Sequence, residues 1–257
     1  SIGIQSFNDT HLKSLGRVHG SQDALSAIDI AQSSGFSNFN IDLMHGLPNQ
    51  SIANAINDIE IAVSSGASHI SWYQLTIEPN TEFFSRPPLL PVDDRLADIQ
   101  QSGLNIIKKN NYSQYEVSAF ARNGQKSRHN VNYWQFGDYL GIGAGAHGKI
   151  TIPEDNQVIR TTKTRQPKDY LNRVGSPLAK KTEISKEDII LEFMMNGLRL
   201  NNGVPTHYLS SRTGVDEKSI KQKVSKLQSQ GLMESSALRY QTTSLGYQFL
   251  NTVLQSF

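Results

Sequence analysis

The sequence contains no cysteine among its 257 residues. This absence excludes a disulfide, a thiolate nucleophile, a cysteine-ligated zinc ion and a cysteine-ligated iron–sulfur cluster within the chain. It indicates a reducing compartment only weakly, because a zero count carries little information of its own.

Long apolar runs and a strong net charge are missing as well. No segment approaches the roughly 20 apolar residues that span a bilayer, and no basic segment followed by an apolar stretch opens the chain as in a signal peptide. The net charge of +2 is too small to predict a polyanionic partner. With 37% apolar and 19% charged residues, we expect a soluble, cytoplasmic protein of one or two domains.

The chain has no initiator methionine, and residues 1–6 already alternate like a strand. Natural N-termini usually begin with a polar lead-in. We therefore expect a fragment of a longer protein.

From residue 1 to about 120, apolar patterns predict strands alternating with helices. The expected strands are 1–6, 38–43, 69–76 and 112–119. The expected helices are 21–34 with Ser21 as N-cap, a helix from the cap Ser51 to Gly66, and 93–109. This alternation predicts an α/β fold with a parallel sheet, either open or closed into a barrel.

Polar residues close each predicted strand. They are Gln5 and Ser6, Asp42, Gln74 and Thr76, and Glu116 and Ser118. Binding sites in parallel α/β folds are built at the carboxyl ends of strands. Taken alone, each of these residues is better explained as the start of a loop, but four strand ends in succession favour a site at this edge.

Residues 121–182 are polar and predict turns and short strands. The segment Gly143–Gly148 fits G-x-G-x-x-G, but strand-like residues Lys149–Pro153 follow it where a dinucleotide site needs a helix. His129 stands beside Arg128 and shortly before Tyr133 and Trp134. This pattern fits a wall for a flat, anionic, aromatic ligand with His129 as an axial donor to iron; the alternative is a hydrogen-bonded structural histidine.

From about residue 183, the pattern predicts a winged-helix arrangement. Three helices (186–199, 205–211 and 216–230) precede two short strands (232–234 and 238–242) and a last helix (244–255). Eight basic residues from Glu183 onward are offset by seven acidic ones, whereas a phosphate-binding face needs a clustered surplus. We therefore expect a packing or partner module rather than a nucleic-acid-binding one.

Six segments carry a resemblance to a known family. They are Gly3–Phe7, Leu15–His19, Asp42–Pro48, Trp72–Thr81, His129–Trp134 and Gly141–His147. Together they resemble the oxygen-independent coproporphyrinogen III oxidase family of radical S-adenosylmethionine (SAM) proteins. The closer resemblance is to the HemW-type heme-chaperone branch, for which the His-Asn-x-x-Tyr-Trp string is typical. The resemblance covers essentially the whole chain.

The resemblance implies a partial radical SAM (β/α) barrel, its later strands only, in residues 1–120. A connecting segment follows in 121–182, and a winged-helix-like α+β domain in 183–257. Family members begin with a Cys-x-x-x-Cys-x-x-Cys segment that ligates a [4Fe–4S] cluster, followed by a glycine-rich stretch that meets SAM. Because neither is in this sequence, the chain resembles the family's C-terminal two-thirds. Such a piece holds no cluster ligands, should be inactive alone, and would leave an unpaired sheet edge that favours aggregation or dimerisation.

By the same resemblance, Gln5, Arg17 and Asp42 stand where the family contacts SAM, and Thr76 lies near a further contact. An arginine can pair with the methionine carboxylate in a bidentate fork, and an aspartate can accept from ribose hydroxyls. His129 stands where the chaperone branch holds heme.

Three functions follow from these observations. The favoured one is a chaperone that binds heme and delivers it to acceptor proteins. The alternative is the oxidase itself, which cleaves SAM reductively and decarboxylates two propionates. The third is an interaction or nucleic-acid-binding module that uses the winged helix.

Overall fold

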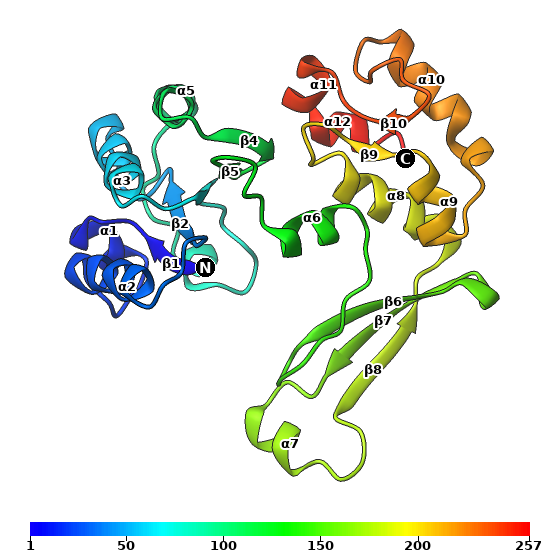
Figure 1. Ribbon diagram of the computed structural model, residues 1–257, viewed down its shortest axis with the longest axis horizontal. Coiled ribbons are helices and arrows are strands. Elements are labelled where there is room, and N and C mark those ends of the chain that lie inside the picture. The colour runs from blue at the N-terminus through cyan, green and yellow to red at the C-terminus, as the bar shows by residue number, and fades with distance from the viewer. The chain divides into compact units, whose positions relative to one another are not determined.

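In the computed structural model, which describes residues 1–257, contacts divide the chain into two compact units (Figure 1). The first is Ser1–Ser127 and the second is Arg128–Phe257. The finer division at residues 120 and 182 stays a prediction. No helix is both long enough and apolar enough to cross a bilayer.

The first unit is built on a five-stranded mixed sheet in the order β1-β2-β3-β5-β4. Its strands are β1 (Ile2–Gln5), β2 (Asn40–His45), β3 (His69–Gln74), β4 (Ser113–Glu116) and β5 (Ala119–Ala121). Strands β1, β2 and β3 run parallel, as predicted, whereas β5 is antiparallel to both β3 and β4. The sheet is therefore parallel only in its first three strands.

The expectation of one strand over 112–119 was wrong, because a tight turn interrupts it. The Glu116 carboxylate accepts from the backbone N–H of Ser118 at 3.1 Å and closes the turn between β4 and β5. Glu116 is buried by this arrangement. Glu116 does end a strand, as predicted, and its side chain closes the hairpin that follows.

Five helices accompany this sheet, and the three long ones pack against one of its faces. They are α1 (Asp9–Ser14), α2 (Ser21–Ser33), α3 (Ile52–Ser64), α4 (Glu82–Ser85) and α5 (Asp93–Lys109). The three long helices were predicted. The Ser51 hydroxyl caps α3 as expected by accepting from the Asn54 N–H at 3.1 Å. The N-cap of α2 is Gly20 rather than Ser21, and the Asp23 carboxylate accepts from the Gly20 N–H at 2.8 Å.

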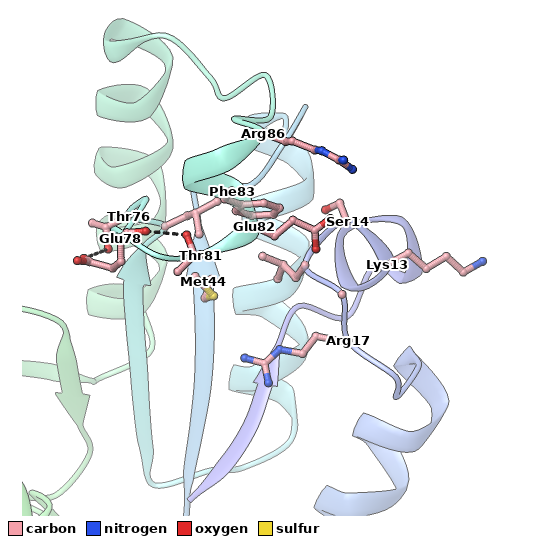
Figure 2. A pocket seen from close by; sticks show the side chains of 13 residues that line it. Lys13, Ser14, Arg17, Met44, Thr76, Glu78, Thr81, Glu82, Phe83 and Arg86 are labelled. Carbon is pink, nitrogen blue, oxygen red and sulfur yellow. Dashed lines mark hydrogen bonds between the residues drawn. The ribbon is translucent and has the colours of Figure 1, made fainter. Parts of the chain in front are cut away.

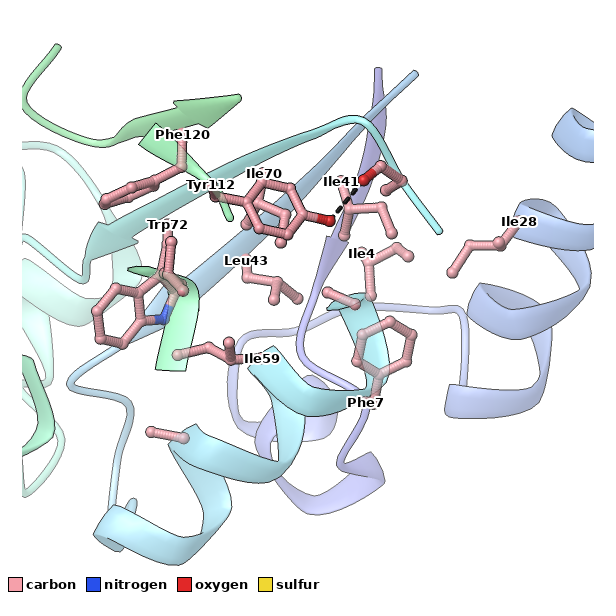
Figure 3. Packing of buried hydrophobic residues seen from close by; sticks show 14 of the residues in the cluster. Ile4, Phe7, Ile28, Ile41, Leu43, Ile59, Ile70, Trp72, Tyr112 and Phe120 are labelled. Atoms are coloured by element: carbon pink, nitrogen blue, oxygen red, sulfur yellow. Dashed lines mark hydrogen bonds between the residues drawn. The ribbon is translucent and has the colours of Figure 1, made fainter. Parts of the chain in front are cut away.

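The core of the first unit lies between the sheet and these helices (Figure 3). Along β2, Ile41 and Leu43 are fully buried, whereas the alternating residues Asn40, Asp42 and Met44 are only half-buried. Because side chains alternate across a strand, the apolar set faces the helices and the polar set lies on the opposite face. The fold thereby leaves one face of the sheet for polar groups.

The second unit contains a three-stranded antiparallel sheet and a helical C-terminal part. The sheet consists of β6 (His147–Ile152), β7 (Gln157–Lys163) and β8 (Leu178–Glu183), and η1 (Pro153–Asp155) joins β6 to β7. Helix α6 (Arg128–Trp134) precedes the sheet, and α7 (Pro167–Asn172) lies at its far end (Figure 1). The glycine-rich segment runs into β6, which confirms the strand predicted after it.

The C-terminal part has helices in the predicted order and a different wing, but the helix predicted at 216–230 begins as a 3-10 helix and the one predicted at 244–255 is interrupted at Phe249. Its elements are α8 (Lys186–Gly197), β9 (Val204–Pro205), α9 (His207–Thr213), η2 (Glu217–Ile220), α10 (Lys221–Ser229), β10 (Arg239–Tyr240), α11 (Ser244–Gln248) and α12 (Leu250–Leu254). The expected hairpin is reduced to one bridge between Met233 and Thr242, and β10 pairs instead with β9. These elements enclose a second apolar core that includes Phe193, Leu209 and Leu227.

Candidate functional site

The polar face of the first unit's sheet brings together groups from three neighbouring strands. Gly3 of β1 lies opposite Asp42 of β2, and Met44 of β2 lies opposite Tyr73 of β3. Asp42 is the third residue of β2, not its end, because the strand continues to His45. Its side chain reaches the site from the middle of the sheet face.

Gln5 ends β1 in an unusual conformation. Its φ is +73°, in the left-handed region, and the β1–β2 register shifts between Gly3 and Gln5. The side chain is 5% exposed, and its Oε1 accepts from the Tyr73 hydroxyl at 2.7 Å. Non-glycine residues in this backbone region cluster at functional sites.

A buried carboxylate on α3 supports the turn after Gln5. Asp58 accepts from the Ser6 hydroxyl at 2.8 Å and from the Phe7 N–H at 2.7 Å. Burial raises the pKa of Asp58 to about 6, although both hydrogen bonds act to lower it. The helix therefore fixes where the site residue Gln5 leaves the sheet.

Asp42 lies half-buried with a partner at each carboxylate oxygen. The Ser1 hydroxyl donates to Oδ2 at 2.8 Å, and the Asn40 amide donates to Oδ1 at 2.7 Å. Each carboxylate oxygen retains a lone pair for a further donor. The group is thus oriented and can still accept from hydroxyls of a ligand.

Arg17 and Thr76 line the same cavity, which has a volume of about 500 Å³ (Figure 2). Arg17 follows α1, Thr76 follows β3, and Met44 of β2 lies between these two segments. Gly16 has a φ of +68°, which lets the chain turn sharply from α1 into Arg17. The exposed guanidinium of Arg17 has no ion-pair or hydrogen-bond partner in the protein, whereas the Thr76 hydroxyl donates to Glu78 at 3.1 Å.

Tyr73 links the predicted residues, and the sequence reasoning missed it. Burial raises the pKa of the Tyr73 phenol, and the Asp42 carboxylate raises it further, while Arg17 and the hydrogen bond to Gln5 oppose the shift. Tyr73 therefore lies within electrostatic reach of three of the four predicted SAM contacts. Strict alternation along 69–74 places Tyr73 on the face away from Trp72, which was the available signal.

A buried histidine extends this polar face. His69 pairs through Nδ1 with the Asn40 amide oxygen at 2.6 Å and through Nε2 with the Tyr115 hydroxyl at 2.8 Å. Burial lowers the pKa of His69 to about 4, and the nearby Asp42 carboxylate only partly offsets this effect. The ring is neutral at physiological pH and orders the side chains around Asp42.

His129 belongs to the second unit, on the short helix α6. Its side chain is exposed and makes no hydrogen bond within the protein. Tyr133 stands one helical turn later on the same side, and its ring lies 5.1 Å from Trp134 and 5.3 Å from Tyr139. The structure therefore supplies the aromatic cluster expected beside His129 and leaves the imidazole free to bind a ligand.

No group of three or more His, Cys, Asp or Glu side chains is arranged to hold a metal ion.

Comparisons with known proteins agree with one another. Residues 184–249 match the family model described as the HemN C-terminal domain. The heme chaperone HemW of Escherichia coli (strain K12) is 46% identical over the whole chain, which covers 67% of that protein. A mitochondrial radical S-adenosyl methionine domain-containing protein of Bos taurus is 34% identical over 91% of the chain and 56% of its own length.

The fold resembles a solved structure of a radical SAM enzyme. Coproporphyrinogen III oxidase (HemN) from Escherichia coli matches with a TM-score of 0.75 and 18% identity, covering 99% of this chain and 62% of that one. This match confirms the α/β fold expected of a partial radical SAM barrel with a C-terminal domain, although the antiparallel β5 makes the sheet mixed rather than parallel throughout. The chain spans about two thirds of the length of the curated relatives it matches. At 46% identity over its full length, the chain belongs to the HemW family of heme chaperones.

Proposed function

We propose that the polar sheet face and the adjoining cavity bind SAM through Gln5, Arg17, Asp42 and Thr76. The observation that carries this proposal is the unpartnered Arg17 guanidinium in a cavity that Thr76 also lines. A volume of about 500 Å³ is typical of small-molecule sites.

The donor set fits the chemical groups of SAM. The Arg17 fork suits a carboxylate such as that of the methionine moiety. The Asp42 carboxylate suits ribose hydroxyls, and the Gln5 amide adds a donor on the neighbouring strand. Reductive cleavage is the chemistry that bound SAM supplies in radical SAM proteins. Ligands for a [4Fe–4S] cluster lie outside this chain in our proposal, because the chain has no cysteine.

We further propose that the intact protein binds heme with His129 as a ligand and delivers it to an acceptor protein. The exposed imidazole without a protein partner and the neighbouring aromatic cluster support this role. Relatives described as heme chaperones are 46% and 38% identical over the whole chain, whereas the oxidase structure is 18% identical and shows the fold alone. These identities favour a chaperone over an oxidase.

Titration of the chain with heme, followed by absorbance, tests the role of His129. We expect saturable binding whose spectrum and affinity change in His129→Ala. His207→Ala is the matched control, since His207 is also exposed and lies in the same unit. A spectrum and affinity unchanged in His129→Ala would remove His129 as the ligand.

Calorimetric titration with SAM tests the other site. Arg17→Ala should weaken binding by about tenfold or more, because a charge-assisted hydrogen bond is lost. Arg95→Ala, an exposed arginine on α5, should leave the affinity unchanged. Equal effects of the two substitutions would count against the assignment of Arg17.

A further inference from the structure

The two ends of the buried Gln5 amide have different surroundings. Oε1 accepts from the Tyr73 hydroxyl at 2.7 Å, whereas Nε2 donates to no group of the protein. Nε2 lies over Gly3, where an added Cβ would stand 3.1 Å away. A side chain that is only 5% exposed thus keeps an unused donor beside a stretch of backbone that has no side chain. Nε2 is not one of the fully buried polar atoms that lack a partner, so it faces accessible space in which water or a ligand atom can accept from it.

The backbone conformation of Gln5 is a second indication of a ligand. A φ of +73° is costly for any residue that has a side chain, and glycine would adopt it freely. Packing on α3 holds the turn regardless, since Asp58 binds Ser6 and Phe7. The turn itself therefore does not require a glutamine at position 5, and the amide side chain must serve another purpose.

We infer that Tyr73 is a positioning residue, which holds the Gln5 amide oxygen so that the Nε2 end is presented to an acceptor atom of the ligand. This inference rests on the proposed SAM site. Without the phenol, the amide could rotate by half a turn and present its oxygen over Gly3 instead. Gly3 lies opposite Asp42, so the site offers a donor from Gln5 next to an acceptor from Asp42. An alcohol group of the ligand can satisfy both, by accepting from the amide and donating to the carboxylate.

The phenol can act as a permanent donor. Burial raises the pKa of Tyr73, so its proton stays in place at physiological pH. The other ionisable groups that act on it are Asp42, on the neighbouring strand, and Arg17, after α1.

A double-mutant cycle on SAM affinity tests the inference. We expect Tyr73→Phe to weaken binding by about five- to tenfold, because one fixed hydrogen bond is lost. In a Gln5→Ala background, Tyr73→Phe should have no further effect, since there is no amide left to orient. Tyr112→Phe is the matched control. It also removes a buried phenol hydroxyl in the first unit, one that donates to the Ala67 carbonyl at 2.5 Å, and it should leave the affinity unchanged.

A second variant separates orientation from folding. In Gln5→Glu, the carboxylate still accepts from Tyr73, but the donor over Gly3 is gone. We expect this variant to melt below the wild type, because the new carboxylate is buried near Asp42. At temperatures where it is folded, it should bind SAM as weakly as Gln5→Ala.

The outcomes distinguish the two proposals. Unchanged affinity in Tyr73→Phe, equal losses in both backgrounds, or full affinity in Gln5→Glu would overturn the role of Tyr73. Absence of SAM binding by the unaltered chain would instead overturn the assignment of the SAM site to these residues.

Discussion

The buried carboxylate of Asp58 should make the first unit less stable as the pH rises. Most paired carboxylates have the opposite effect, because their pKa is lowered by folding. Burial raises its pKa from 3.8 to about 6. A raised pKa means that the folded protein holds the proton more tightly than the unfolded chain. The stability that the protonated Asp58 contributes to the folded unit is complete below pH 3.8 and is lost as the pH rises through 6.

The size of the effect follows from this shift. A difference of roughly two pKa units corresponds to about 3 kcal/mol in the free energy of unfolding. Asp58→Asn removes the ionisation and keeps an amide oxygen that can accept from the Phe7 N–H. The stability of the variant relative to the wild type should therefore increase between pH 4 and pH 7 by up to about 3 kcal/mol, and then level off.

Urea denaturation at several pH values measures this difference. The two tryptophans lie in different units, so Trp134→Phe provides a background in which Trp72 alone reports on the first unit. Comparing each variant with the wild type cancels the contributions of other groups, such as the buried histidines. Asp98→Asn, on the exposed side of α5, is the control and should show a constant difference. A constant difference for Asp58→Asn as well would refute the reasoning.

Three further predictions concern the same unit. Gly103→Ala should destabilise it by about 1–3 kcal/mol in urea denaturation, because an added Cβ would stand 2.1 Å from the Trp72 ring; wild-type stability would contradict the packing. An NMR titration of His69 should show a midpoint near pH 4, since burial lowers its pKa, and a midpoint near 6.5 would contradict the burial. The stability that the neutral ring contributes is complete above pH 6.5 and is lost as the pH falls through 4. Ser51→Ala should cost about 1 kcal/mol through loss of the α3 cap, and Ser33→Ala, at the far end of α2, should cost much less.

Local patterns predicted the elements of the first unit well where one physical rule dominated. The helix after Ser51 was predictable because an apolar stripe, a capping serine and Gly66 agree on its limits. The hairpin at 113–121 was not, because its turn depends on a contact between the Glu116 side chain and the backbone at Ser118. Such contacts leave no periodic signal.

The residues of the candidate site stay a prediction, whereas their arrangement comes from the structure. Resemblance indicated Gln5, Arg17, Asp42 and Thr76, and the structure places Arg17 and Thr76 at one cavity with Gln5 and Asp42 on the adjoining sheet face. The position of Asp42 within β2 depends on how far the strand extends, which composition does not determine. The role of Tyr73 depends on pairing between β2 and β3, which is a tertiary property.

The left-handed backbone of Gln5 has a consequence for protein engineering. Glycine at this position would relieve backbone strain of about 1 kcal/mol, but it would also leave a cavity and would deprive the Tyr73 hydroxyl of its acceptor. Heat resistance alone is therefore a poor guide to this position, because Gln5→Gly removes a donor from the site whatever its net effect on stability. Designed libraries of this chain should hold position 5 constant.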